Sequence, residues 1–179
     1  MQRRPWLHSR VRRPAKATTQ PGVGERPPES RQALAVEELA DFLIAREYPN
    51  IKGTRHARMQ TLFQAVIDRQ ASLVAKWMST GFIHGVMNTD NMALSGETID
   101  FGPCAFMERF RPDQVYSSID RRGRYAWHKQ PEMAVWNLTR FAETLLPVLA
   151  DNPEKAIEFA QDALGDFSQK FSAYFSSAM

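Results

Sequence analysis

The sequence has very little cysteine and no long apolar run. Of its 179 residues only Cys104 is a cysteine, which excludes a disulfide within the chain and a zinc cluster built from several cysteines. No apolar stretch approaches the roughly 18 residues of a membrane-spanning helix, so we expect no membrane partner. The length allows about one domain and excludes a large multidomain enzyme. A lone cysteine suits a reducing compartment, which favours a cytoplasmic protein, or a mitochondrial one in a eukaryote.

Basic residues are in excess only near the amino terminus. Residues 1–33 hold eight Lys or Arg and two Glu, whereas the other 146 residues hold 15 basic and 18 acidic residues. The same segment has five prolines and few apolar side chains, so we predict a disordered basic arm over 1–33. A transit peptide fits less well because prolines oppose an amphipathic helix. A nucleic-acid-binding arm also fits less well, since aromatic residues do not interleave the arginines, and no nucleic acid partner is expected.

From Leu34 onward the apolar residues recur at helical spacing. The first apolar face ends at Tyr48 and Pro49, where proline removes the backbone donor that a longer helix would need. A second pattern of three- and four-residue steps predicts a helix over about 57–80. Gly81 follows it, at the position where a helix end favours a left-handed residue. Residues 34–179 are therefore predicted to form one helical lobe.

Two further helices are predicted in the last third of the chain. One begins at Pro131, because proline is favoured in the first turn of a helix. The other begins at Pro153, with Asp151 or Asn152 as its cap. Gly165 lies inside this last apolar pattern and weakens the case for one continuous helix.

The helical periodicity is interrupted between residues 82 and 130. Residues 92–94 and 98–100 are predicted to form two short strands, joined by a turn at 95–97. The segment 101–130 shows no sustained period, and loops of that length are usually functional or mobile. The predicted fold class is therefore mainly α with a short β-hairpin.

Three polar residues in this irregular region have the spacing of a phosphotransferase site. In protein-kinase-like enzymes a His-x-Asp-x-x-x-x-Asn loop precedes a hairpin and an Asp-Phe-Gly turn, and the Asn and the second Asp bind magnesium. His84, Asn91 and Asp100 fit this spacing. Val86 stands where the pattern has its catalytic Asp and cannot act as a base. Asp90 is the nearest carboxylate that could replace it.

Simpler interpretations of these residues remain open. Asp90 and Asn91 are also a common turn pair, Asp100 could cap a strand end, and a loop histidine such as His84 usually orders the backbone. A transition-metal site that adds Cys104 is disfavoured by the unsystematic spacing.

Aromatic and basic side chains outside the loop also have two interpretations. Trp77, Trp136 and Phe141 are predicted to lie in the core rather than to bind a ligand. The basic cluster of Arg121, Arg122 and Arg124 is interpreted as a solvated loop face, or alternatively as a contact for a protein substrate.

Taken together, the motifs resemble the SelO family of pseudokinases, which are protein adenylyltransferases. The resemblance extends over about 39–149 and rests on three segments. These are the run GFIHGVMNTDNM at 81–92, the turn IDFGP at 99–103, and the later GRYA at 123–126 with Gln130-Pro131 and Trp136-Asn137-Leu138.

The resemblance implies a magnesium-dependent transfer of AMP from ATP to Ser, Thr or Tyr hydroxyls of target proteins. Asp90 would accept the proton, Asn91 would bind magnesium, and Asp100 would bind magnesium and contact the nucleotide. The catalytic loop would span 82–92 and the Asp-Phe-Gly-like turn 100–102.

Members of the family are longer than this chain. The glycine-rich loop, its strand lysine and its helix glutamate have no match here, so the chain is interpreted as a kinase-like C-lobe fragment lacking the N-lobe. We expect it to be inactive or impaired alone. The alternatives are a non-catalytic helical remnant that acts as an interaction module, a pseudogene product, or an ordinary phosphotransferase, which Val86 disfavours.

Overall fold

The computed structural model describes residues 28–179, and the fold within that range is mainly helical. In chain order the elements are α1 (Pro28–Glu47), α2 (Arg55–Ser79), β1 (Phe82–Ile83), η1 (Thr89–Asn91), β2 (Ala105–Phe106), η2 (Trp127–Lys129), α3 (Gln130–Leu149), α4 (Pro153–Gly165) and α5 (Phe167–Ala178). The short strands β1 and β2 pair in antiparallel fashion. The expected mainly α fold with a small β element is confirmed.

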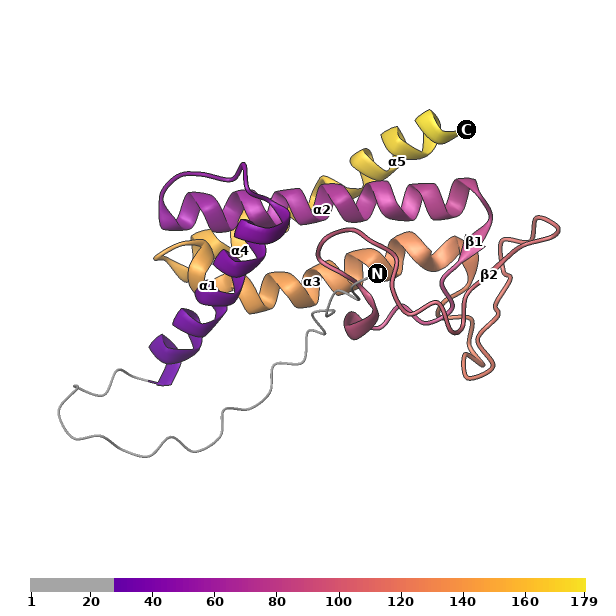
Figure 1. Cartoon of the computed structure of the whole chain (residues 1–179), viewed down its shortest axis with the longest axis horizontal. Coiled ribbons are helices and arrows are strands. Elements are labelled where there is room, and N and C mark those ends of the chain that lie inside the picture. The colour runs from indigo at the N-terminus through magenta and orange to yellow at the C-terminus, as the bar shows by residue number, and fades with distance from the viewer. Residues whose placement is uncertain (1–27) are drawn as a thin grey trace, which may run out of the picture.

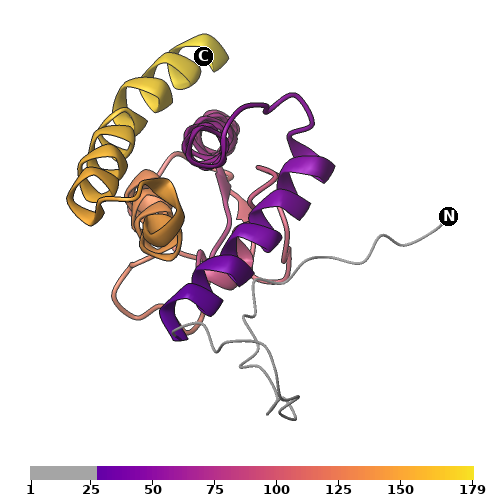
Figure 2. The same ribbon diagram turned by 90° about the vertical axis from the view of Figure 1, so that its left-hand side faces the viewer.

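Helix α2 is the centre of the molecule. It runs beside α3 in the opposite direction, with β1 and β2 beyond one end of the pair (Figure 1). Helix α1 crosses the pair on one side, whereas α4 and α5 cover the other (Figure 2). One face of α2 is buried along its whole length because apolar residues recur there every three or four positions. That face carries Met59, Leu62, Phe63, Val66, Ile67, Gln70, Ala71, Val74, Ala75, Trp77 and Met78.

The helix ends follow the sequence signals closely. Helix α1 ends at Glu47, before Pro49, and α2 covers the predicted range to within two residues at each end. Gly81 has a φ of 71°, the left-handed conformation expected after α2. None of the helices in residues 28–179 is long and apolar enough to cross a membrane.

The last predicted helix is divided at Gly165. Helix α4 ends there and α5 begins at Phe167, so the glycine marks a break rather than a tolerated interior residue. Asn152 is the cap of α4, since its side-chain oxygen accepts hydrogen bonds from the amides of Glu154 (2.7 Å) and Lys155 (3.1 Å). Of the two proposed caps, Asn152 is confirmed.

The amino-terminal boundary differs from the expected one. Helix α1 already begins at Pro28, so residues 28–33 belong to a helix although the predicted arm ended at residue 33. Proline at the first helical position loses no hydrogen bond and has a suitable φ, which explains the early start. The rest of the predicted arm, residues 1–27, lies outside the described residues.

The predicted hairpin at 92–94 and 98–100 is reduced to one isolated antiparallel bridge, between Met92 and Thr98. The carbonyls of residues 93–95 do not pair with a second strand. They accept hydrogen bonds from side chains of neighbouring segments instead. The donors are Gln70 (to Ala93, 2.7 Å), Tyr48 (to Leu94) and Arg69 (to Ser95, 3.1 Å). Strand pairing is therefore unnecessary there, and the paired strands are β1 and β2.

Candidate active site

The loop after α2 and the turn around Asp100 are held together at three points. The ring Nε2 of His84 donates a hydrogen bond to the carbonyl of Ile99 (2.8 Å). Gly85 packs so closely on the carbonyl of Pro103 that no side chain fits between them. The third point is the bridge between Met92 and Thr98. Asp100 lies between Ile99 and Pro103, so the structure holds it against the loop that carries Asp90 and Asn91.

Asp90 and Asn91 share the short helix η1. Asp90 is exposed to solvent, and Asn91 is partly buried. The Nδ2 of Asn91 donates a hydrogen bond to the carbonyl of Val86 (3.0 Å). Because this bond fixes the amide orientation, the Oδ1 is left as the atom that can accept a hydrogen bond or bind a cation.

Asp100 is the only non-glycine residue with a positive φ among residues 28–179, at 54°. Such a conformation is strained for residues with a Cβ and is best tolerated by Asp and Asn. Its side chain is exposed and carries a carboxylate, the ligand type that magnesium prefers. A residue whose neighbours hold its backbone in such a conformation is typical of functional sites.

His84 is fully buried, and its ring lies 5.3 Å from the ring of Trp77. Its amide donates to the side-chain oxygen of Gln130 (3.0 Å), and its ring donates to Ile99. These contacts make His84 a residue that orders the loop. Burial lowers the pKa of the imidazole from 6.5, and the Ile99 carbonyl and the charge of Asp100 oppose this effect only in part.

We expect the stability of the fold to depend on His84 in mildly acidic solution. As the pH falls below 6.5, the unfolded chain takes up a proton that the folded chain binds only at a lower pH. The urea concentration at the unfolding midpoint should therefore decrease as the pH is lowered from 6.5 to the lower pKa of the folded state. In His84→Gln it should decrease less steeply. Proton NMR of the His84 ring should titrate below pH 6.5. An NMR titration midpoint of the His84 ring above pH 6.5 would contradict this assignment.

Polar side chains from α3 and the preceding loop position the backbone of this loop, and sequence reasoning assigned them no role. Gln130, buried at the start of α3, accepts from the amide of His84 and donates to the carbonyl of Phe82 (3.0 Å). Asn137, seven residues further along α3, donates to the carbonyl of Met87 (2.9 Å). The hydroxyl of Tyr125 donates to Asn88 (2.6 Å). The available signal was a polar residue on the apolar face of a helix, as at Asn137.

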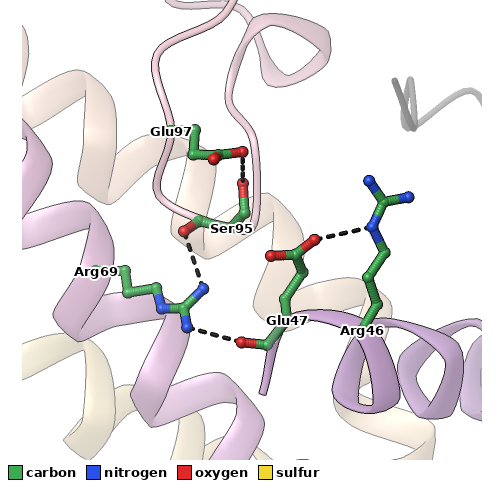
Figure 3. Close-up of polar contacts among 5 residues, drawn as sticks. All are labelled: Arg46, Glu47, Arg69, Ser95 and Glu97. Carbon is green, nitrogen blue, oxygen red and sulfur yellow. Dashed lines mark hydrogen bonds and ion pairs between the residues drawn. The ribbon is translucent and has the colours of Figure 1, made fainter. Parts of the chain in front are cut away.

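Arg69 fixes the far end of the loop to the end of α1. Its guanidinium donates to the carbonyls of Glu47 (2.7 Å) and Ser95 (3.1 Å), as Figure 3 shows. The same group lies 3.9 Å from the ring centroid of Tyr48. Nearby, Arg46 pairs with Glu47, and the hydroxyl of Ser95 donates to Glu97 (Figure 3). The tip at residues 94–97 is thereby held by α1 and α2.

A cavity of about 460 Å³ lies beside the loop. Helices α1, α2 and α3 and the segment 89–99 form its walls, which are mostly apolar. Thr89, the neighbour of Asp90, and Arg140 on α3 both line it. A volume of this size lies within the range of small-ligand pockets in proteins.

The three aromatic residues predicted to lie in the core differ in their burial. Trp77 is buried and Phe141 partly buried, but Trp136 is 40% exposed, so its assignment to the core is wrong. Trp136 lies on the exposed face of α3, two residues away from the buried Ala134 and Leu138 and so on the opposite side of the helix. Cys104 is partly exposed and its thiol donates to the carbonyl of Phe101. Within residues 28–179 no three His, Cys, Asp or Glu side chains form a metal-binding group.

The fold and the loop therefore define a helical lobe in which a histidine-ordered loop meets an aspartate turn. The family model described as "Protein adenylyltransferase SelO" matches residues 9–179. The chain belongs to the SelO family. The match begins well before residue 39 and ends after residue 149, so it is wider than the resemblance read from the motifs.

Curated bacterial relatives carry the name "Protein nucleotidyltransferase YdiU". The protein of Bradyrhizobium diazoefficiens is 54% identical over 149 residues, which is 83% of this chain and 30% of the relative. The protein of Halalkalibacterium halodurans is 51% identical over 144 residues, 80% of this chain and 29% of the relative. The protein of Rhodopseudomonas palustris strain BisB18 is 56% identical over 141 residues. The chain thus spans about 30% of the length of these relatives.

Proposed function

We propose that this chain is the kinase-like catalytic-loop region of a protein adenylyltransferase that moves AMP from ATP to Ser, Thr or Tyr hydroxyls. The observation that supports this most is the attachment of the Asp100 turn to the Asp90–Asn91 loop on both sides of Asp100, through Ile99 and Pro103. Membership of the SelO family supports it independently.

In this proposal Asn91 and Asp100 bind magnesium together with the triphosphate of ATP. The Oδ1 of Asn91 and the exposed carboxylate of Asp100 are hard oxygen donors, and magnesium usually takes one or two protein ligands plus phosphate oxygens. A site of this kind needs no closed cluster of three acidic or histidine side chains. Magnesium, when bound, would offset the negative charge of the phosphates.

Asp90 is the proposed proton acceptor. The target hydroxyl oxygen forms a bond to the α-phosphorus of ATP while the bond from that phosphorus to the bridging oxygen breaks. Pyrophosphate leaves with the electron pair, and the hydroxyl proton passes to the Asp90 carboxylate. The exposure of Asp90 on η1 leaves its carboxylate accessible to a protein substrate.

Positive groups around the phosphates supply much of the stabilisation in phosphoryl and nucleotidyl transfer. None of the three proposed site residues is cationic, so we expect this chain alone to bind ATP with magnesium weakly and to transfer no measurable AMP. Activity is best tested in a chimera, in which this chain replaces the matching segment of the Bradyrhizobium diazoefficiens relative.

The chimera should label a protein substrate with AMP from α-labelled ATP, and Asp90→Ala should reduce labelling by about 100-fold or more, because it removes the general base. Asp113→Ala, at an exposed aspartate of the loop 101–130, is the matched control and should leave labelling unchanged. Equal labelling by Asp90→Ala and the parent chimera would refute the proposed base. A chimera that folds but neither binds ATP nor labels protein would favour the non-catalytic helical remnant.

A further inference from the structure

Two arginines lie over the exposed indole ring of Trp136. The guanidinium carbon of Arg124 lies 4.9 Å from the ring centroid and that of Arg140 lies 5.6 Å from it. Arg121 and Arg122, on the turn that leads to Arg124, are also exposed. We call Arg121, Arg122, Arg124, Arg140 and Trp136 the arginine patch.

Most of the positive charge in the arginine patch is not neutralised. Within residues 28–179, Arg121, Arg122 and Arg124 form no ion pair, and Arg140 pairs with Glu143 (2.7 Å). A guanidinium that stacks on an aromatic face keeps its N–H edge available for a carboxylate. The pair between Arg140 and Glu143 shows that a carboxylate can approach one of these stacked guanidinium groups.

Two features connect the arginine patch to the candidate active site: a series of hydrogen bonds and a shared cavity. The Asp120 carboxylate accepts hydrogen bonds from the amides of Arg124 (2.9 Å) and Tyr125 (2.7 Å), and the hydroxyl of Tyr125 donates to Asn88, two residues before Asp90. Burial of the Asp120 carboxylate raises its pKa, but the hydrogen bonds from the backbone amides lower the pKa by more. Asp120 is therefore ionised at neutral pH, and the turn stays intact.

The second connection runs through the cavity. Arg140 lines the same 460 Å³ cavity as Thr89, the residue before Asp90. Arg140 of the arginine patch and the neighbour of Asp90 therefore open onto the same cavity.

We propose that the arginine patch binds an acidic segment of the protein substrate beside the hydroxyl that receives AMP. This inference rests on the proposed function for the role of Asp90. A protein segment is favoured over nucleic acid because residues 34–179 hold 15 basic and 18 acidic residues, so the positive potential is local. Nucleic acid binding usually uses a longer basic surface.

The test is fluorescence anisotropy with the whole chain and labelled peptides of sequence EEEGSGEEE, QQQGSGQQQ and KKKGSGKKK, without ATP. We expect the acidic peptide to bind about tenfold more tightly than the neutral one at low salt, and the basic peptide not to bind. The double variant Arg124→Gln with Arg140→Gln should weaken acidic-peptide binding at least about fivefold. The double variant Lys76→Gln with Lys155→Gln, which removes two charges from exposed positions on α2 and α4, is the matched control and should change it less than about twofold.

Equal affinity for the acidic and neutral peptides, or equal effects of the arginine double variant and the lysine double variant, would overturn the proposal. Displacement of the peptide by polyuridylate at a lower concentration than by unlabelled EEEGSGEEE would assign the patch to nucleic acid instead. Displacement by low concentrations of inorganic pyrophosphate would assign it to the nucleotide. Because the assay contains no ATP, its result is independent of whether Asp90 acts as a base.

Discussion

Gly85→Ala should destabilise the fold by about 3 kcal/mol or more, measured as the free energy of unfolding in urea. Gly85 has a φ of 89°, in the left-handed region where a side chain costs about 1–2 kcal/mol. In addition, a Cβ at this position would overlap the carbonyl oxygen of Pro103, which is backbone and cannot move aside easily. Both effects act at the contact between the loop 82–92 and the Asp100 turn.

Gly165→Ala is the matched control for this substitution. A Cβ at Gly165 would meet no atom within 4 Å, and its φ is not in the left-handed region. We expect that variant to be neutral or more stable than the parent by less than about 1 kcal/mol, since alanine favours helix over glycine. A loss below about 1 kcal/mol in Gly85→Ala would mean that the loop and the turn are not pressed together.

Asp100→Asn should abolish the metal-dependent part of ATP binding, with affinity for ATP and magnesium reduced at least about tenfold. The substitution keeps the size and the tolerance for positive φ but removes the negative charge that the cation requires. Isothermal titration with ATP, with and without magnesium, measures the effect. Asp113→Asn, at an exposed aspartate of the loop 101–130, should bind like the parent.

If Asp100→Asn and the parent bound ATP equally in the presence of magnesium, Asp100 would not be a metal ligand. If neither bound ATP but both unfolded cooperatively, the lobe would lack a nucleotide site of its own. The two outcomes distinguish a misassigned ligand from a missing site.

The helices could be predicted from the sequence because each has a local cause. The apolar period of α2, Pro49 after α1, the Asn152 cap and the Gly165 break all act within a few residues of the boundary they set. The early start of α1 at Pro28 was missed because the surrounding prolines and arginines indicated an arm.

The loop could not be predicted in the same way, because its conformation depends on contacts between distant segments. The carbonyls of Ala93 and Leu94 are satisfied by Gln70 and Tyr48, and no local pattern announces such donors. The spacing of His84, Asn91 and Asp100 predicted a site in this segment, but the contacts of Gln130 and Asn137 with the loop emerge only from the packing of α3. The core assignment of Trp136 was wrong because Ala134 and Leu138 lie on the buried face of α3, and a residue two positions away from both lies on the opposite face.

The most direct test of the central claim is paramagnetic NMR with Mn²⁺ in place of Mg²⁺, in the presence of ATP. A chain of 20.5 kDa is small enough for its amide resonances to be followed one by one, even when the ligand binds weakly. We predict that Mn²⁺ with ATP broadens the amides of residues 90–91 and 100–102 first, and that Asp100→Asn removes this effect. Broadening centred elsewhere, or unchanged in Asp100→Asn, would contradict the assignment of Asn91 and Asp100 to one shared metal–nucleotide site.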